Sequence, residues 1–263
     1  MPRKVPMFRR AAICLFLLSV LGLGRAEGVD PFGSLLWPDL QREFLGGAPV
    51  VFDARVQVQG PAFAEDPMNV PISIAADGLG EVEQIMVFVD RNPIRKVLEY
   101  FPLGALPRVA LRFKLQQASP VRAAVKTRDG VWHVGGTWVD SAGGGCTAPG
   151  ETRRDGSWTT TLGETSARLF PHSTAAGASS DSTRLRLRVM HPMDTGLAGG
   201  IPAFYINRLS LRDANGRELM RLNAYEPVSE NPIFSFDFAQ PPPGPLQLVG
   251  SDNNGNRIGG ALP

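Results

Sequence analysis

Cys146 is the residue of this sequence best suited to covalent chemistry, because a thiolate can accept another group and release it again. It lies in the run SAGGGCTAPG at residues 141–150, where no large side chain falls within four positions of the sulfur. Glycine has no Cβ atom and samples positive φ freely, so Gly143, Gly144 and Gly145 predict a flexible arm. A structural cysteine normally has apolar neighbours, and none occur nearby in sequence. The pattern favours a thiol that takes up a cargo in one place and delivers it in another.

Two other chemistries fit the sequence less well. A Cys–His nucleophile pair needs a base held at hydrogen-bond distance, and a glycine-rich arm does not fix that geometry. A metal site needs several ligands at set spacing, whereas the histidines, His133, His172 and His191, are scattered. We therefore predict no catalytic residue, no metal and no cofactor, and a structural role for His191. Arg153 and Arg154 either favour the thiolate or are solvated charges.

The N-terminus has the pattern of a secretory signal peptide. Basic residues at positions 3, 4, 9 and 10 precede the apolar run 11–23, and Gly24-Arg25-Ala26 offers the small residues that a signal peptidase reads. The apolar run is shorter than the roughly 20 residues that cross a bilayer. We expect cleavage after Ala26, a periplasmic location and no membrane attachment afterwards. The pattern leaves open whether export is by the general or the twin-arginine route.

Removal of the signal changes the charge and the cysteine count. It carries five of the 27 basic residues and none of the 25 acidic ones, so the mature chain has 22 basic against 25 acidic residues, a net charge of −3. This balance gives no electrostatic case for binding nucleic acid. Cys14 leaves with the signal, and Cys146 remains as the one mature cysteine. An unpaired cysteine in an oxidising compartment indicates a reactive thiol or an intermolecular disulfide, including one to a second copy.

The mature chain predicts an all-β protein with one short helix. Apolar residues at 36, 40 and 44 recur at helical spacing, and Gly46-Gly47 would end the helix. The period then becomes two, with strands expected around 56–58, 72–74, 85–89, 109–115, 121–126 and 131–134. The turn at 127–130 joins the last two strands into a hairpin. These strands predict a β-sandwich over about 48–140.

A second β unit is expected over 181–262. Alternating strands around 184–189, 209–211, 219–222, 234–238 and 246–248 are punctuated by turns at 213–216 and 252–255. The phenylalanine stripe at 234, 236 and 238 predicts core. Residues 141–180, rich in Gly, Ser, Thr and Ala, are interpreted as arm plus linker, with Trp158 and Phe170 able to dock on a domain. The fold class is therefore two immunoglobulin-like β-sandwich domains joined by a Gly-rich arm and linker.

Together these features resemble the sulfur-oxidation carrier proteins SoxY and SoxZ joined in one chain. The SoxY resemblance rests on Val70-Pro71-Ile72-Ser73-Ile74, on residues 85–93 (IMVFVDRNP) and on Gly144-Gly145-Cys146. The SoxZ resemblance rests on residues 191–196 (HPMDTG), on Ile206-Asn207 and on the 252–255 turn (DNNG). The fused arrangement looks like the SoxYZ-like carriers associated with quinoprotein dehydrogenases. It implies a signal peptide at 1–26, a SoxY-like domain at 27–146 ending in the Gly-Gly-Cys arm, a linker at 147–180 and a SoxZ-like domain at 181–263.

The resemblance implies a function in thiosulfate oxidation and sulfur metabolism. A periplasmic carrier would hold a sulfur intermediate covalently on Cys146, and partner enzymes would perform the catalysis, so the chain itself would not be an enzyme. The partners would be sulfur-oxidation enzymes, or a quinoprotein dehydrogenase or its cytochrome. The alternative is a non-catalytic docking module for such a dehydrogenase, with no covalent cargo. In this chain Thr147-Ala148-Pro149 follow the cysteine and the arm is tethered at both ends, unlike the free C-terminal arm of the separate carrier.

Overall fold

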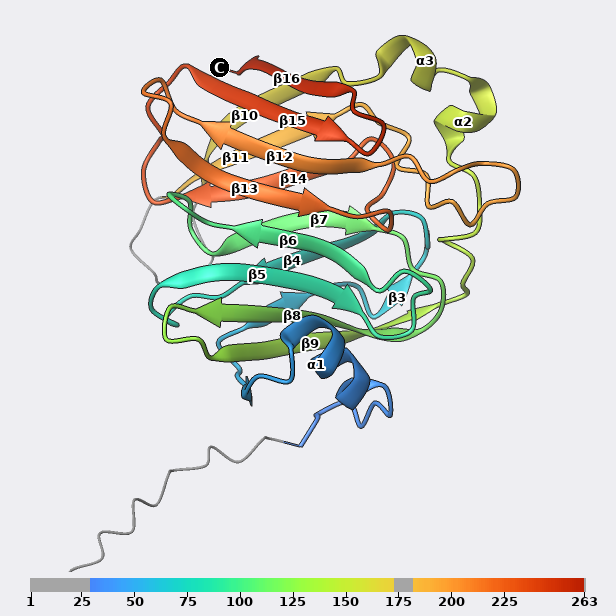
Figure 1. Cartoon of the computed structure of the whole chain (residues 1–263), viewed down its shortest axis with the longest axis vertical. Helices are drawn as coiled ribbons and strands as arrows, with labels where there is room; N and C mark the ends of the chain where they lie inside the picture. The colour runs from blue at the N-terminus through green and yellow to red at the C-terminus, as the bar shows by residue number, and fades with distance from the viewer. Residues whose placement is uncertain (1–28, 173–181, 263) are drawn as a thin grey trace, which may run out of the picture.

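The computed structural model describes residues 29–172 and 182–262, and the predicted signal peptide at 1–26 lies outside them. Most of the described chain is β-strand, as the sequence predicts (Figure 1). The helices are α1 (Trp37–Leu45), α2 (Glu151–Asp155) and α3 (Trp158–Thr161). The first unit holds β1 (Val50–Phe52), β2 (Gln57–Gln59), β3 (Phe63–Ala64), β4 (Val70–Ala75), β5 (Val82–Val89), β6 (Lys96–Phe101), β7 (Arg108–Phe113), β8 (Ser119–Thr127) and β9 (Trp132–Ser141). The second holds β10 (Thr165–His172), β11 (Ser182–Val189), β12 (Ile206–Arg212), β13 (Glu218–Ala224), β14 (Ile233–Phe238), β15 (Leu246–Asp252) and β16 (Arg257–Leu262).

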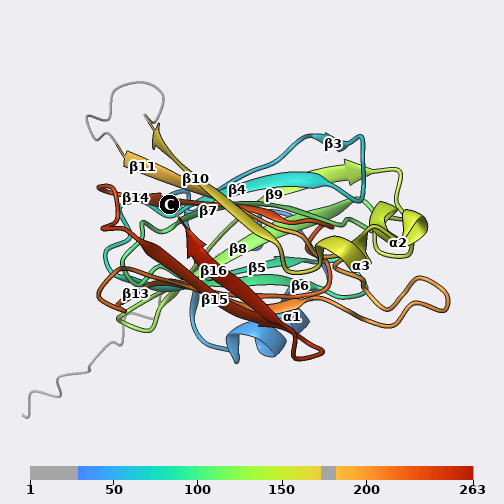
Figure 2. The ribbon, with the colours of Figure 1, turned by 90° about the horizontal axis from the view of Figure 1, so that it is seen from above.

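The two β units share both of their sheets. One sheet runs β1-β9-β8-β5-β6-β13-β12-β15-β16, with β3 beside β9, and the other runs β10-β11-β14-β7-β4-β2. The units meet where β6 pairs with β13 and where β7 pairs with β14, both antiparallel. Seen from above, the two sheets form the two layers of one elongated sandwich (Figure 2). The expected all-β architecture of two immunoglobulin-like sandwiches is confirmed. In addition, the edge strands of the two sandwiches pair directly with each other.

The core between the sheets is continuous across this seam. One buried apolar cluster includes side chains from both units, and Tyr100 of β6 stacks on Phe236 of β14 with ring centroids 5.5 Å apart. Phe234, Phe236 and Phe238 are all buried, so the predicted core stripe is confirmed. Each buried side chain of this size stabilises the fold by roughly 1.5–3 kcal/mol relative to an exposed one.

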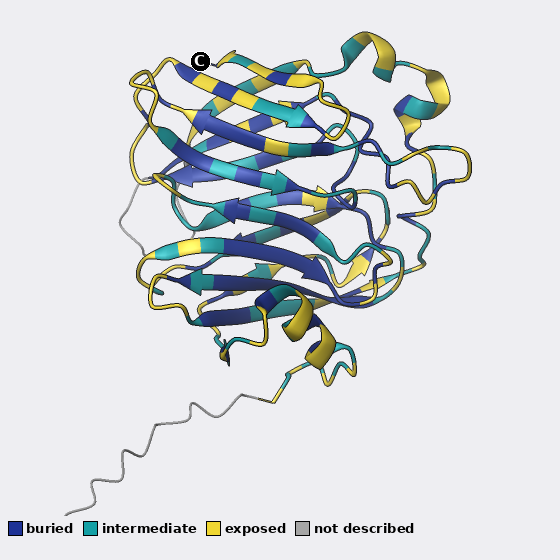
Figure 3. Cartoon of the chain, in the orientation of Figure 1, coloured by how far each residue is buried: buried dark blue, intermediate teal, exposed yellow. Residues whose placement is uncertain are grey.

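The short predicted helix is confirmed as α1. It ends at Gly46, which adopts a left-handed conformation with φ +62° as the sequence pattern requires. Leu40 and Trp37 face a second buried cluster formed with Phe88 of β5 and Trp132 of β9. The helix therefore covers the outer face of the longer sheet, and its opposite face is exposed (Figure 3).

Part of the expected linker is a strand. Residues 165–172 form β10, which pairs along its whole length with β11 and closes one edge of the shorter sheet. The prediction of a linker over 147–180 was therefore wrong for this stretch, because an edge strand of mixed polar and small residues lacks the clear alternation of a half-buried strand. Strand β6 also went unpredicted, since the sequence KVLEYF does not alternate cleanly.

Candidate functional site

The arm around Cys146 is packed against the protein. The Cys146 side chain is 0% exposed, although Thr147 beside it is exposed. The amide of Gly144 donates to the Gln116 carbonyl (3.1 Å), and the amide of Gly145 donates to the Leu115 carbonyl (3.2 Å). The structure thus differs from the free arm that the sequence predicts. The sulfur is buried within a turn, where its printed contact is the carbonyl oxygen of Lys114.

The docked conformation of the arm requires glycine at several positions for steric reasons. Gly143 and Gly144 have φ of +92° and +89°, a region that residues with a Cβ rarely adopt. A Cβ on Gly145 would lie 2.1 Å from the Pro67 carbonyl oxygen and 2.7 Å from that of Leu115. A glycine run can therefore serve close packing as well as flexibility, and the sequence alone cannot separate these two uses.

A short stretch after β7 forms the wall on which the cysteine lies. The Cys146 thiol is 3.5 Å from the Lys114 carbonyl oxygen, and the Cys146 amide donates to Oε1 of Gln116 (3.0 Å). Asn92 fixes this stretch from behind. Its Nδ2 donates to the Lys114 carbonyl (2.8 Å), and its Oδ1 accepts from the Gln116 amide (2.8 Å). Asn92 therefore positions the backbone that receives the thiol.

The second unit closes the site from the other side. The hydroxyl of Thr195 donates a 2.6 Å hydrogen bond to the Cys146 carbonyl oxygen, and the ammonium of Lys114 donates to the Met193 carbonyl oxygen. Alternation along 109–115 predicts Lys114 on the polar face of its strand, yet its side chain is only 2% exposed. The reason is that residues 191–196 of the second unit cover it.

Burial sets the protonation states of the Cys146 thiol and the Lys114 amine. Desolvation raises the pKa of the Cys146 thiol to about 11, and the nearby Lys114 charge offsets this only in part. Desolvation also lowers the pKa of Lys114 to about 8, against the attraction of Asp194, Cys146 and Glu230. At neutral pH the docked cysteine is a neutral thiol, which is a poor nucleophile.

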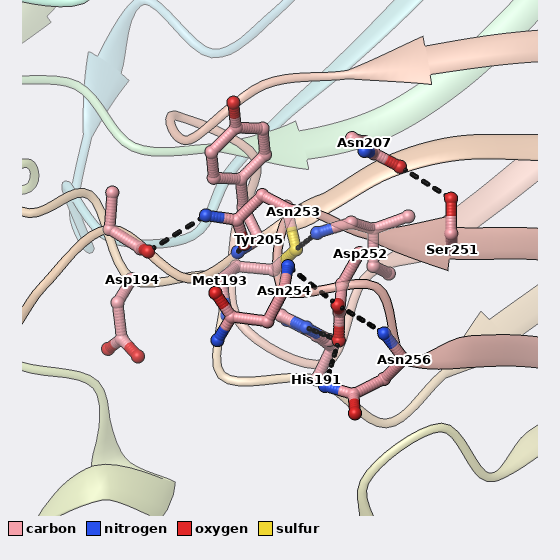
Figure 4. A network of polar contacts seen from close by, with 12 residues as sticks. His191, Met193, Asp194, Tyr205, Asn207, Ser251, Asp252, Asn253, Asn254 and Asn256 are labelled. Carbon is pink, nitrogen blue, oxygen red and sulfur yellow. Dashed lines mark hydrogen bonds and ion pairs between the residues drawn. The ribbon is translucent and has the colours of Figure 1, made fainter.

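The segment 191–196 is itself held by the turn between β15 and β16 (Figure 4). Nδ1 of His191 accepts the Met193 amide (3.0 Å), so Nε2 carries the proton and faces Oδ2 of Asp252 at 3.5 Å. Desolvation lowers the pKa of His191 to about 4, so the ring is neutral. Asp252 in turn accepts the amides of Asn254 and Asn256, both at 2.9 Å. These contacts give His191 the structural role expected from the sequence.

The comparisons with known families match both units. The family model for sulfur oxidation protein SoxY matches residues 41–146, and the model for sulphur oxidation protein SoxZ matches residues 172–260. The chain is a SoxY domain and a SoxZ domain in tandem. Among solved structures, the sulfur carrier protein SoxY from Chlorobium limicola f thiosulfatophilum is similar, with 20% sequence identity over 40% of this chain and 90% of that chain and a TM-score of 0.35. No curated protein matches the chain.

The SoxY match ends at the cysteine. Cys146 is thus the last matched residue of the SoxY domain, and the SoxZ segment 191–196 covers it. The sequence motifs quoted for the two families, residues 85–93 and 191–196, therefore meet at one site. Asn92 bonds the Lys114 carbonyl that the thiol contacts, and Thr195 bonds the Cys146 carbonyl.

The other sequence candidates have structural partners. Nε of Arg153 donates to Oδ2 of Asp194 (2.5 Å), and its guanidinium stacks 3.9 Å above the Trp158 ring. Arg154 is exposed, as a solvated charge would be. Nδ1 of His133 lies 2.9 Å from Oδ2 of Asp53. The His172 side chain lies outside the described residues.

Within residues 29–172 and 182–262, no three His, Cys, Asp or Glu side chains gather closely enough to hold a metal ion. None of the helices described there is long and apolar enough to cross a membrane.

Lys114 and Gln116 are the site residues that the sequence analysis missed. Both lie in FKLQQ at 113–117, which looks like the end of an ordinary amphipathic strand. Their contacts come from the arm 30 residues later and from the SoxZ domain nearly 80 residues later. Contacts at such separation leave no local pattern, so only the family motif around Thr195 pointed to the SoxZ side of the site.

Proposed function

We propose that this protein is a periplasmic carrier that holds a sulfur intermediate covalently on Cys146 and presents it to partner enzymes. The observation that carries the proposal is the position of the cysteine. It is the one cysteine of the mature sequence, it ends the SoxY domain, and its backbone belongs to a surface turn although its sulfur is buried. A thiol stored in this way can be exposed by moving a single turn, without unfolding either domain.

The docked and released states would have different reactivity. The docked thiol is neutral and covered, so it is protected from unselective oxidation. Release into water would return its pKa towards the ordinary value near 8.5, which makes a few per cent of it thiolate at neutral pH. Joining this thiolate sulfur to the sulfur of an anionic substrate makes an S–S bond and removes two electrons. A partner oxidoreductase must accept these electrons, because the carrier itself contributes only the thiolate.

The anchors of the arm limit its reach. Strand β9 ends at Ser141 and α2 begins at Glu151, just after Gly150, so about eight residues can move. Such a segment spans at most about 28 Å when extended, and a loop fixed at both ends projects about half of that. We infer that a partner receives the cargo in a shallow active site rather than at the end of a deep channel.

The partners follow from the carrier role. We propose periplasmic sulfur-oxidation enzymes as the main class, with a quinoprotein dehydrogenase or its cytochrome as the second. Export by the segment 1–26 is part of the same proposal, because it places the thiol in an oxidising compartment with such enzymes.

The test is the intact mass of the exported protein, purified without reductant from cells fed a reduced sulfur compound. A carrier gives an added mass that localises to Cys146, disappears after treatment with a thiol and is absent from Cys146→Ser. The mass of the adduct identifies the cargo. An unmodified thiol under these conditions, together with full sulfur oxidation in cells that carry Cys146→Ser, would support a docking module without covalent cargo.

A further inference from the structure

A groove crosses the outer face of the shorter sheet. This sheet lies on the side of the molecule opposite α1 (Figure 2). It exists because one cross-strand row is made of small side chains: Ser73 of β4 faces Ala110 of β7, which faces Ser235 of β14. Longer side chains, including Arg112 and Arg184, form its walls. The groove has a volume of about 630 Å³ and is open to solvent.

The lining is cationic. Arg112, Arg184 and Arg186 contribute to it, and no Asp or Glu does. A neighbouring hollow of about 340 Å³ shares Arg186 and continues past Arg168 and Arg188. This concentration of positive charge is local, because the chain without its predicted signal is slightly acidic as a whole.

Most of these arginines lack an acidic partner. Arg184 pairs with Asp237 at 2.7 Å. Within the described ranges no ion pair involves Arg112, Arg168, Arg186 or Arg188, and all four are exposed. Arg168 and Arg186 also face each other directly across the β10–β11 pair, an arrangement of like charges that destabilises a sheet. A bound anion would relieve this repulsion.

The spacing of the cations decides what kind of anion fits. Arg168 lies on β10 and Arg112 on β7, three strand spacings apart in the sheet, or about 14 Å. One sulfate or phosphate ion can contact neighbouring arginines but is too small to span that distance. An extended peptide presents a side chain to the same face about every 7 Å. Exposed apolar surface on Phe170, which is 39% exposed, and on Pro71 offers contacts to its backbone and aliphatic groups.

We propose that this groove binds an acidic segment of a partner protein. The segment would lie across the seam between β7 of the SoxY domain and β14 of the SoxZ domain, with its carboxylates on Arg112 and Arg186. Charge complementarity of this kind speeds encounter and fixes orientation, and its strength falls with added salt. The site does not involve Cys146, so it can hold a partner while the arm moves.

The test uses the mature Cys146→Ser protein, so that the result does not depend on the cargo. A fluorescein-labelled twelve-residue peptide of alternating Glu and Ala is titrated with the protein, and fluorescence anisotropy is followed at low salt. We expect saturable binding that weakens about tenfold in Arg112→Gln/Arg186→Gln. The matched control is Arg212→Gln/Arg257→Gln, which removes two exposed charges from the longer sheet and should bind as the parent does. A labelled Gln-Ala peptide should not bind.

Three results would overturn the proposal. The first is no saturable binding of the acidic peptide by the parent. The second is an equal loss of affinity in the control variant, which would mean attraction by overall charge. The third is displacement of the peptide by millimolar sulfate or thiosulfate at constant ionic strength, which would identify a site for a small oxyanion. Thermal melting of both variants within a few degrees of the parent establishes that they are folded.

Discussion

The Thr195 hydroxyl donates a 2.6 Å hydrogen bond to the carbonyl oxygen of Cys146, so the SoxZ domain holds the arm of the SoxY domain in place. The same hydroxyl accepts the amide of Leu197 (3.2 Å), which orients it. The bond joins residues 49 positions apart and reaches the arm at the cysteine itself. Release of the thiol therefore requires this contact to break.

Thr195→Val should release the arm more often. Valine has a similar shape but cannot donate the hydrogen bond, and a neutral hydrogen bond of this kind contributes about 1 kcal/mol. If only the released thiol reacts, alkylation of Cys146 by iodoacetamide at pH 7.5 should become about fivefold faster. Thr159→Val is the matched control, because its exposed hydroxyl bonds the Gly156 carbonyl away from the site. Equal alkylation rates in the two variants would show that Thr195 does not restrain the arm.

Gly145→Ala should also expose the thiol, for a steric reason. The new Cβ would lie 2.1 Å from the Pro67 carbonyl oxygen, so the docked turn no longer fits. We expect alkylation at least tenfold faster than in the parent, with the melting temperature lowered by only a few degrees. Gly199→Ala adds a methyl group where no atom lies within 4 Å and serves as the control. If Gly145 served flexibility alone, the variant would react at the parental rate or more slowly.

The fold was largely predictable because its signals are local. Each signal is contained in a short stretch of the sequence. This holds for the period-two alternation of the strands, for the turns at 127–130, 213–216 and 252–255, and for the helix stop at Gly46. Strand β6 is different. Its residues Lys96 and Glu99 pair with each other on a half-buried surface that the SoxZ domain completes, so its polarity does not alternate as it would beside water.

The site was predictable only in part. The identity of Cys146 follows from the sequence, since it is the one cysteine outside the predicted signal peptide. Its burial does not, because the covering groups come from Lys114, Gln116 and Thr195, which are distant in sequence. The glycine run also has two physical interpretations, and only the positive φ angles and the close approach to Pro67 separate them.

Lys114 should make stability depend on pH between about 8 and 10.5. Its pKa is lowered to about 8 in the folded protein, so the unfolded chain holds the proton more tightly in this window. Stability therefore rises with pH there, and the free energy of unfolding should grow by about 2 kcal/mol from pH 8 to 9.5. Urea denaturation of Cys146→Ser at the two pH values measures this gain. The Cys146→Ser background is needed because burial raises the pKa of Cys146, which would make stability fall with pH and mask the effect of Lys114.

Adding Lys114→Met to that background should abolish the gain with pH, since the buried ammonium is gone. Lys126→Met is the control: Lys126 is a partly exposed residue whose nitrogen lies 3.7 Å from Glu83, and the gain should persist in it. A pH-dependent gain that survives Lys114→Met would assign the effect to another group.

Phe236→Ala should destabilise both domains together. Phe236 belongs to the SoxZ domain, but its ring stacks on Tyr100 of the SoxY domain in the shared core. Truncation of a buried phenylalanine costs about 3–5 kcal/mol. Because the sheets are continuous across β6–β13 and β7–β14, this loss should lower the urea midpoint of the whole molecule.

Three of the four tryptophans lie before residue 140, so tryptophan fluorescence reports mainly on the SoxY domain. We expect its midpoint to fall in step with that of the far-ultraviolet ellipticity. A fluorescence midpoint that stays at the parental value, with ellipticity lost in two steps, would mean that the two domains unfold independently despite their paired edges.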